Sequence, residues 1–372
     1  MMNRIRQITL LGQAIWLDYI SRDLVRSGEL AALIDEGVTG LTSNPTIFHT
    51  AISGSITYDD DIRRLAREGK SAAQVYETLA LADIGAAADC LRPVYNETHG
   101  RDGFVSLEVD PKLAHDTAAT MADARRLYRT LNRPNVMIKV PATEQGMPAI
   151  AALIGEGINV NATLIFSIAL YEKVMDAYIA GLGRFRKTGR PLGLVSSVAS
   201  FFVSRIDTLT DKVIEHRIKH GEEHLEPLYG RAAVAYAKLA YARYRAVFEG
   251  PRFEELRSAG ARPQRPLWAS TSTKNPAYPD TKYVDSLIGV NTVSTVPPDT
   301  LRALQDHAVT AQTVDDGLAQ AQATLDELAS IKVDMSWVAD TLLQEGVQAF
   351  IDSHEQLLAD IEAKRAALLP VA

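Results

Sequence analysis

Eight short segments rich in β-branched and other apolar residues recur along the 372-residue chain, and helical segments separate them. Glycine or proline bounds most of these strand segments, as is usual for short buried strands. Strands that alternate with helices in this way predict a (β/α)8 barrel, an α/β fold in which helices surround a closed parallel sheet. The expected strands cover residues 14–18, 37–44, 104–109, 135–140, 158–166, 192–199, 265–271 and 290–295.

The structural alternative is an open, doubly wound parallel sheet. Such a sheet would carry a glycine-rich phosphate loop directly after an early strand. No early strand segment of this chain is followed by such a loop, and Gly181-Leu182-Gly183 follows a helical segment instead. The pattern therefore favours the barrel.

Two long helices are expected at the carboxyl end of the chain, over residues 313–330 and 336–368. The second has an apolar stripe that begins at Trp337 and ends near Ile361. Because a helix with such a stripe must bury it against another element, we expect it to lie across the barrel within a single domain of residues 1–372. The other expected helices cover residues 21–36, 58–68, 71–91, 113–132, 147–155 and 167–181, with a long helical section that ends near 249.

The composition limits the class of protein. The net charge of −7 argues against a general binder of nucleic acids or anionic membranes. The single cysteine, Cys90, cannot form an internal disulfide, which fits a reducing cytoplasm. Gly12, Gln13 and Asp18 interrupt the apolar run near the start, so this run predicts neither a signal peptide nor a membrane span.

The fourth strand segment carries one charged residue, Lys139, in the otherwise apolar run Val136–Val140. Lysine is seldom fully buried without a reason. In a dry site its pKa falls, and the neutral amine can attack a carbonyl carbon to form a Schiff base. The alternative is a lysine at the end of a strand whose ammonium group reaches solvent.

The alternation of side chains in six strand segments bears on this choice, because residues two apart on a strand share a face. In the fourth segment the valines and isoleucine should pack on helices, so Lys139 points into the barrel. Each polar residue alone is also consistent with a satisfied side chain or a helix cap, but six strands that agree around one lysine favour a catalytic centre. The inward polar residues are Asp18, Thr42, Asn44, Ser106, Glu108, Asn159, Asn161, Thr163, Ser196 and Ser200.

Four motifs in these segments resemble those of the transaldolase family. The motifs are Thr42-Ser43-Asn44-Pro45-Thr46, Ser106-Leu107-Glu108-Val109-Asp110-Pro111, Ile138-Lys139-Val140-Pro141-Ala142-Thr143 and Gly157 to Ser167. The resemblance continues in order from about Ile15 to the last helix. It implies a cytosolic enzyme of the pentose phosphate pathway. Such an enzyme moves a dihydroxyacetone unit from sedoheptulose 7-phosphate or fructose 6-phosphate to glyceraldehyde 3-phosphate or erythrose 4-phosphate.

The resemblance also implies a role for each matching residue. Lys139 would form the Schiff base, and Asp18 would be the acid and base for carbon–carbon cleavage. Glu108 and Thr163 would hold a water molecule that relays protons. The residues expected to bind the substrate are Asn44, Asn161, Ser200 and Arg205, with Arg205 on the phosphate.

Two positions bear on the phosphate site and on the choice between transfer and release. A second phosphate-binding arginine often follows the seventh strand, but this chain offers Lys274, which binds phosphate without the fork of an arginine. Aldolase relatives place a tyrosine where this chain has Phe202, which cannot donate a proton. This difference favours transfer of the three-carbon unit over its release.

Three hypotheses stay open at this point: a transaldolase, a related aldolase that releases dihydroxyacetone, and a non-catalytic barrel that binds sugar phosphates. A protonated imine is itself an electron sink, so we expect no metal and no other cofactor. His216 and His220 have the spacing of zinc-binding helices, but the glutamate that should follow the first histidine is absent, which indicates a solvated helix face. A monomer and a homodimer are equally consistent with the sequence.

Overall fold

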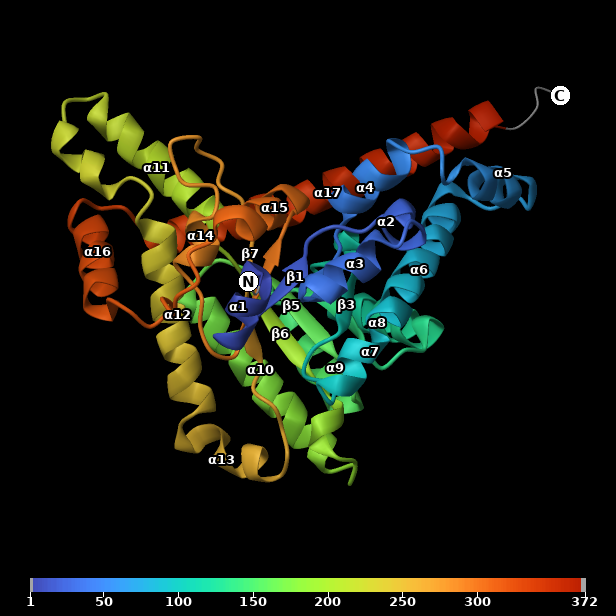
Figure 1. Ribbon diagram of the computed structural model, residues 1–372, viewed down its shortest axis with the longest axis horizontal. Helices are drawn as coiled ribbons and strands as arrows, with labels where there is room; N and C mark the ends of the chain where they lie inside the picture. The colour runs from blue at the N-terminus through green and yellow to red at the C-terminus, as the bar shows by residue number, and fades with distance from the viewer. Residues whose placement is uncertain (1–2, 369–372) are drawn as a thin grey trace.

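Eight parallel strands close into a barrel in the order β1 to β8 in a computed structural model of the chain. The structure describes residues 3–368, so the first two and the last four residues of the expected domain lie outside it. The closed sheet and its surrounding helices confirm the predicted (β/α)8 fold (Figure 1). The strands are β1 (Gln13–Leu17), β2 (Val38–Thr42), β3 (Phe104–Glu108), β4 (Val136–Pro141), β5 (Val160–Ile165), β6 (Ser197–Phe202), β7 (Arg265–Ala269) and β8 (Thr292–Val296).

Helices follow the strands and cover the outside of the barrel. Within residues 3–368, none of them combines the length and apolar character of a membrane span. The helices of the first half are α1 (Arg4–Leu10), α2 (Arg22–Arg26), α3 (Glu29–Glu36), α4 (Pro45–Ser53), α5 (Asp59–Arg67), α6 (Ala72–Cys90), α7 (Arg92–Glu97), η1 (Pro111–Leu113), α8 (Thr117–Leu131) and α9 (Gly146–Glu156). Those of the second half are α10 (Ile168–Arg186), η2 (Leu192–Leu194), α11 (Ser204–Ile218), η3 (Glu223–Leu228), α12 (Ala232–Phe248), α13 (Pro251–Ser258), α14 (Lys282–Asp285), α15 (Pro298–His307), α16 (Leu318–Ser330) and α17 (Met335–Leu368).

The register of the sheet places polar residues of neighbouring strands side by side. Lys139 on β4 pairs with Glu108 on β3 and with Asn161 on β5. Every residue of these three strands is buried, because helices cover the outer face and side chains fill the barrel. The polar side chains therefore form a cluster inside an otherwise apolar core.

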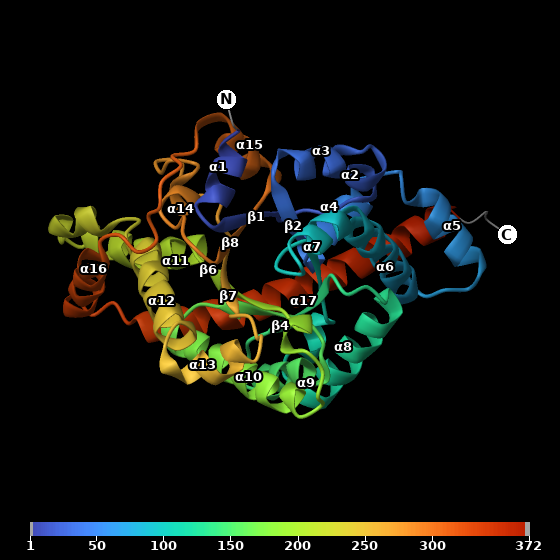
Figure 2. The ribbon, with the colours of Figure 1, turned by 60° about the horizontal axis from the view of Figure 1, so that its bottom comes forward.

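The long helix α17 crosses the barrel and contacts elements that are far apart in the sequence (Figures 1 and 2). It packs against α4, α5 and α6 on one side and against α11 on the other. Its buried residues include Val338, Leu342, Phe350, Leu357 and Ile361, which recur at helical spacing. The prediction that the last helix lies across the barrel is confirmed.

The sixth strand begins later than the sequence pattern predicts. Residues 192–194 form the short helix η2, whose Leu192 is buried, instead of starting the strand. Pairing with β5 begins at Ser197, which pairs with Val160 and donates its hydroxyl to the Val160 carbonyl at 2.6 Å. The expectation of a strand over 192–199 is therefore wrong at both ends, since the strand runs from Ser197 to Phe202. Leu192 and Val195 are buried outside the sheet, whereas Leu194 is exposed.

Two expected helical sections are interrupted. The segment expected as one helix over 21–36 is divided into α2 and α3 at Gly28, whose φ of 84° lies in the left-handed region. The long section that ends near 249 is divided into α11, η3 and α12, with Pro227 inside η3 and Gly230 at a φ of 65°. In both cases glycine permits a turn that the helical spacing of apolar residues does not reveal.

Candidate active site

Lys139 lies deep inside the barrel and does not reach solvent. Its side chain is 5% exposed, and its Nζ lies 3.4 Å from Glu108 Oε2. The same Nζ donates a hydrogen bond to the Ser43 carbonyl at 3.3 Å, and it lies 5.4 Å from the ring centroid of Phe350 on α17. The inward orientation expected from the alternation is therefore the one that the structure has.

A cavity of about 310 Å³ opens above Lys139 at the carboxyl ends of the strands, where barrel enzymes bind their substrates. Seven of the nine site residues expected from the sequence line this cavity. They are Asp18, Asn44, Lys139, Thr163, Ser200, Arg205 and Lys274. The remaining two, Glu108 and Asn161, contact members of this group from within the barrel.

Asp18 directly follows β1, and its carboxylate accepts a hydrogen bond from the Thr42 hydroxyl at 2.6 Å. Burial raises the pKa of Asp18, and the positive charges of Lys139 and Lys274 lower it in part. A carboxylate with a raised pKa is a stronger base than an ordinary aspartate. Asp18 is thus suited to accept a proton from a hydroxyl group in the cavity.

Glu108 is the second buried carboxylate beside Lys139. Burial raises the pKa of Glu108 to about 7, although the charge of Lys139 opposes this rise. Within residues 3–368, neither its oxygens nor the buried hydroxyl of Thr163 has a hydrogen-bond partner, apart from the ion pair with Lys139. Buried polar atoms of this kind are usually satisfied by water or by a ligand, so the two side chains fit the water relay that the resemblance implies.

Asn161 is the centre of a hydrogen-bonded group below the cavity. It is fully buried, its amide donates to Ser106 Oγ at 3.1 Å, and its Oδ1 accepts from Ser200 Oγ at 2.7 Å. These bonds fix the orientation of the Ser200 hydroxyl, which lines the cavity. The expected contact of Asn161 with substrate hydroxyls stays a prediction.

Asn44 both caps a helix and lines the cavity. Its Oδ1 accepts a hydrogen bond from the Ile47 backbone N–H at 2.9 Å and so caps α4, while the side chain also lines the cavity. Helix α4 is not among the helices expected from the sequence, although an asparagine followed by proline is a common start of a helix. The helix cap and the position in the cavity are both present at this residue.

Two cations lie at the mouth of the cavity. Arg205 lies in the first turn of α11, with its guanidinium 5.6 Å from the ring centroid of Phe202, and burial lowers its pKa. Lys274, on the loop after β7, donates to Ser272 Oγ at 2.6 Å; burial and the charge of Arg205 lower its pKa. Two neighbouring cations at a helix N-terminus are suited to a phosphate group.

Comparisons with known proteins identify the family. A model of the transaldolase/fructose-6-phosphate aldolase family matches residues 15–361 of this chain. The chain belongs to this family. A protein of Thermobifida fusca named transaldolase is 50% identical over 365 residues, which are 98% of each chain. The transaldolase of Acidothermus cellulolyticus is 49% identical over 363 residues, 97% of this chain and 96% of that one. A Nostoc protein named transaldolase 2 is 44% identical over 378 residues, 99% of each chain.

The name of the family joins two activities, and Phe202 bears on the difference between them. Its ring lines the cavity, is 7% exposed and lies 5.1 Å from the ring of Phe166. A phenylalanine cannot donate a proton. The side chain at position 202 therefore supplies no acid to the cavity.

Two further residues of the site were not expected as functional from the sequence. Thr295 on β8 lines the cavity, and its hydroxyl lies 2.6 Å from that of Thr42. Phe350 of α17 closes the cavity over Lys139. The apolar stripe of the last helix includes Phe350, but a stripe alone does not show which of its members meets the barrel mouth.

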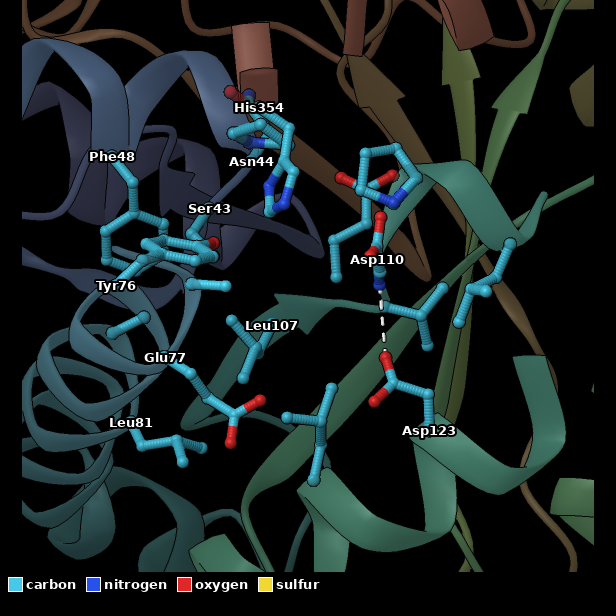
Figure 3. A pocket seen from close by; sticks show the side chains of 18 of the residues that line it. Ser43, Asn44, Phe48, Tyr76, Glu77, Leu81, Leu107, Asp110, Asp123 and His354 are labelled. Carbon is cyan, nitrogen blue, oxygen red and sulfur yellow. Dashed lines mark hydrogen bonds between the residues drawn. The ribbon is translucent and has the colours of Figure 1, made fainter. Parts of the chain in front are cut away.

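A smaller cavity of about 170 Å³ lies between α4, α6, α8 and α17 (Figure 3). Tyr76 and Glu77 of α6 lie on one side of it, and Asp123 of α8 lies on the other, where it accepts a hydrogen bond from the Asp110 backbone N–H. Glu108 also lines this cavity, but Lys139 and Asp18 do not. The amine of Lys139 and the carboxylate of Asp18 therefore face the larger cavity and not this one.

Proposed function

We propose that the protein is a transaldolase that forms a Schiff base on Lys139. It transfers a dihydroxyacetone unit from sedoheptulose 7-phosphate or fructose 6-phosphate to glyceraldehyde 3-phosphate or erythrose 4-phosphate. The observation that carries the proposal is a buried lysine amine that faces a closed cavity between two carboxylates with raised pKa values. An amine in this position can attack the carbonyl carbon of a ketose bound in the cavity, and the two carboxyl groups can exchange protons with the reacting groups.

The first half of the reaction forms and uses the imine. The Lys139 amine attacks the ketone carbon of the ketose phosphate, and loss of water leaves a protonated imine. Asp18 then takes the proton of the hydroxyl group next to the bond that breaks. The electron pair of this carbon–carbon bond moves into the imine, which leaves an enamine on Lys139 and releases an aldose phosphate.

The second half reverses these steps with a different aldehyde. The enamine carbon attacks the carbonyl carbon of the acceptor, and Asp18 returns the proton to the new hydroxyl group. Hydrolysis of the imine then frees the product and restores the amine. A water molecule between Glu108 and Thr163 would carry the protons that enter and leave during imine formation and hydrolysis, for which a carboxyl group with a pKa near neutral pH is suited.

The two cations at the cavity mouth indicate that the substrate carries a phosphate group. Arg205 and Lys274 lie at the solvent side of the cavity, whereas Lys139 lies at its base. A ketose phosphate has its ketone and its phosphate at opposite ends, so one molecule can place the first at Lys139 and the second between the two cations. The partners that we propose are therefore phosphorylated sugars, in agreement with the family.

Trapping of the imine tests the proposal directly. Incubation with fructose 6-phosphate and borohydride should reduce the imine, and mass spectrometry should then locate the three-carbon adduct on Lys139. Lys139→Arg should show no adduct and no turnover, because a guanidinium group remains protonated and cannot form the imine. An adduct on another lysine, or no adduct at all, would overturn the mechanism.

The aldolase activity is the second candidate, and Phe202 argues against it. Without a tyrosine hydroxyl at the position of Phe202, release of dihydroxyacetone should be slow when fructose 6-phosphate is the only substrate. Added erythrose 4-phosphate should accelerate the formation of glyceraldehyde 3-phosphate with ping-pong kinetics. Rapid release of dihydroxyacetone that does not depend on an acceptor would favour the aldolase.

We also propose that residues 1–372 act as one domain in the cytoplasm, without nucleic-acid or membrane partners. The negative net charge and the single cysteine support this setting. The oligomeric state is either a monomer or a homodimer, which light scattering on the purified protein would distinguish.

A further inference from the structure

A second cavity lies at the end of the barrel opposite Lys139. Its volume is about 330 Å³, close to that of the substrate cavity. Residues next to the amino ends of β3, β6, β7 and β8 line it, together with Met137 of β4 and residues of α12 and α13. Because all eight strands are parallel, these amino ends lie at the face that does not carry the active site.

Four arginines line this cavity, although the chain as a whole is negatively charged. Arg265 is buried and forms an ion pair with Asp102 at 3.0 Å, and Arg257 pairs with Glu254. Arg101 and Arg262 have no carboxylate partner within residues 3–368. The Arg101 guanidinium donates to Asn291 Oδ1 at 2.8 Å, while Arg262 donates to the backbone carbonyls of residues 99 and 100 and, at 3.2 Å, to Ser196 Oγ.

The two unpaired arginines leave an excess of positive charge around the cavity. The one carboxylate among its lining residues is Glu249, and this group pairs with Arg245 at 2.8 Å. Burial lowers the pKa of Arg262, and the charges of Arg265 and Arg101 lower it further. Like charges that lie this close together repel one another unless an anion lies between them.

The side chain of Tyr244 also lines this cavity. Tyr244 of α12 is 1% exposed and makes no hydrogen bond within residues 3–368. Burial and the neighbouring Tyr241 and Glu249 raise the pKa of Tyr244, while the charges of Arg265 and Arg101 lower it in part. A buried tyrosine hydroxyl usually finds a hydrogen-bond partner, and here the free space beside it is the cavity.

We propose that this cavity binds a small phosphorylated metabolite, at a site distinct from the active site. Guanidinium groups match the geometry of phosphate oxygens, and several cations together favour a multiply charged anion. Arg101 and Arg262 supply the unpaired charge, and the hydroxyl of Tyr244 supplies a donor to a phosphate oxygen. The volume admits a ligand about as large as the substrate of the opposite cavity. The site does not depend on the reaction proposed for Lys139.

Calorimetry with inorganic pyrophosphate tests this site. The full chain should carry Arg205→Ala and Lys274→Met, so that the mouth of the active site no longer attracts phosphate. This double variant, which serves as the background for the further substitutions, should bind one pyrophosphate per chain. Arg101→Met should weaken binding about tenfold or more, as expected for the loss of a charge-assisted hydrogen bond. Tyr244→Phe should weaken it about threefold or more, because only the hydroxyl is removed.

Arg243→Met is the matched control, because it also removes one positive charge. Arg243 lies on α12, next to Tyr244, but it is exposed and pairs with Glu172. The substitution should leave the affinity for pyrophosphate within about twofold, because the charge that it removes makes only an exposed ion pair. Absence of binding by the background at millimolar pyrophosphate would overturn the proposal. So would equal losses in Arg101→Met and Arg243→Met, which would indicate attraction by surface charge alone. Unchanged binding in both Arg101→Met and Tyr244→Phe would likewise exclude this cavity.

Discussion

Replacement of Glu108 by glutamine should stabilise the fold while it impairs catalysis. Burial raises the pKa of Glu108 from 4.5 to about 7 in the folded chain. Each pKa unit corresponds to about 1.4 kcal/mol, so the ionised carboxylate costs the folded state about 3 kcal/mol at high pH. Glutamine has nearly the same volume and no charge, and it avoids this cost.

The sign of the pH dependence follows from the same pKa values. The folded chain keeps the proton of Glu108 up to about pH 7, whereas the unfolded chain loses it near pH 4.5. The folded chain binds this proton more tightly than the unfolded chain does, and this difference stabilises the fold. The stabilisation is complete below pH 4.5 and is lost as the pH rises to 7. Glu108→Gln should match the parent near pH 4.5 and exceed its stability by about 3 kcal/mol at pH 8.

Thermal unfolding at several pH values measures this difference. With about 2.1 cal/mol/K of unfolding entropy per residue and 372 residues, a gain of about 3 kcal/mol corresponds to a rise in Tm of about 4 °C at pH 8. The kcat should fall by about 10²-fold or more, because a proton carrier is lost. Glu97→Gln is the control, since Glu97 is exposed at the end of α7. An equal rise in Tm for Glu108→Gln and Glu97→Gln would refute the reasoning. So would a difference in Tm between Glu108→Gln and the parent that does not change with pH, because the free-energy cost would then not come from ionisation of Glu108.

Three other substitutions test the phosphate site, the choice between transfer and release, and the packing of the barrel. Arg205→Ala should raise the KM for phosphorylated sugars about 10-fold to 100-fold with a smaller change in kcat, and an unchanged KM would place the phosphate elsewhere. Phe202→Tyr should increase release of dihydroxyacetone from fructose 6-phosphate relative to transfer, and a ratio equal to that of the parent would contradict the role of Phe202. Gly40→Ala should lower the free energy of unfolding in urea by about 1–3 kcal/mol, because the new Cβ would lie 2.5 Å from the buried Trp16 ring; an unchanged midpoint would show that the ring moves at little cost.

Much of the site could be predicted from the sequence because it is built on strands. Side chains alternate with a fixed period of two, so a single apolar face determines the direction of Lys139 and of Glu108 beside it. The barrel then brings the carboxyl ends of all strands together. Asp18 and Thr163 were placed correctly in the cavity for the same reason.

The parts that escaped prediction depend on contacts between distant segments. The apolar residues of 192–195 fit a strand equally well, and only their packing outside the sheet decides against it. Phe350 has the spacing of an ordinary core residue, and its contact with Lys139 follows from how α17 crosses the barrel. The arginine-lined cavity combines residues from five elements and the segments beside them, which no local pattern relates to one another.

The position of Phe350 on the last helix sets an order of events during synthesis of the chain. All eight strands are complete at Val296, but the ring that covers Lys139 belongs to a helix that begins only at Met335. At about 5–20 residues per second, the ribosome needs several seconds to add the residues between Val296 and Phe350. During that interval a barrel already closed would hold Lys139 in a cavity that Phe350 does not yet cover. The site is therefore complete only after the last helix docks on the barrel.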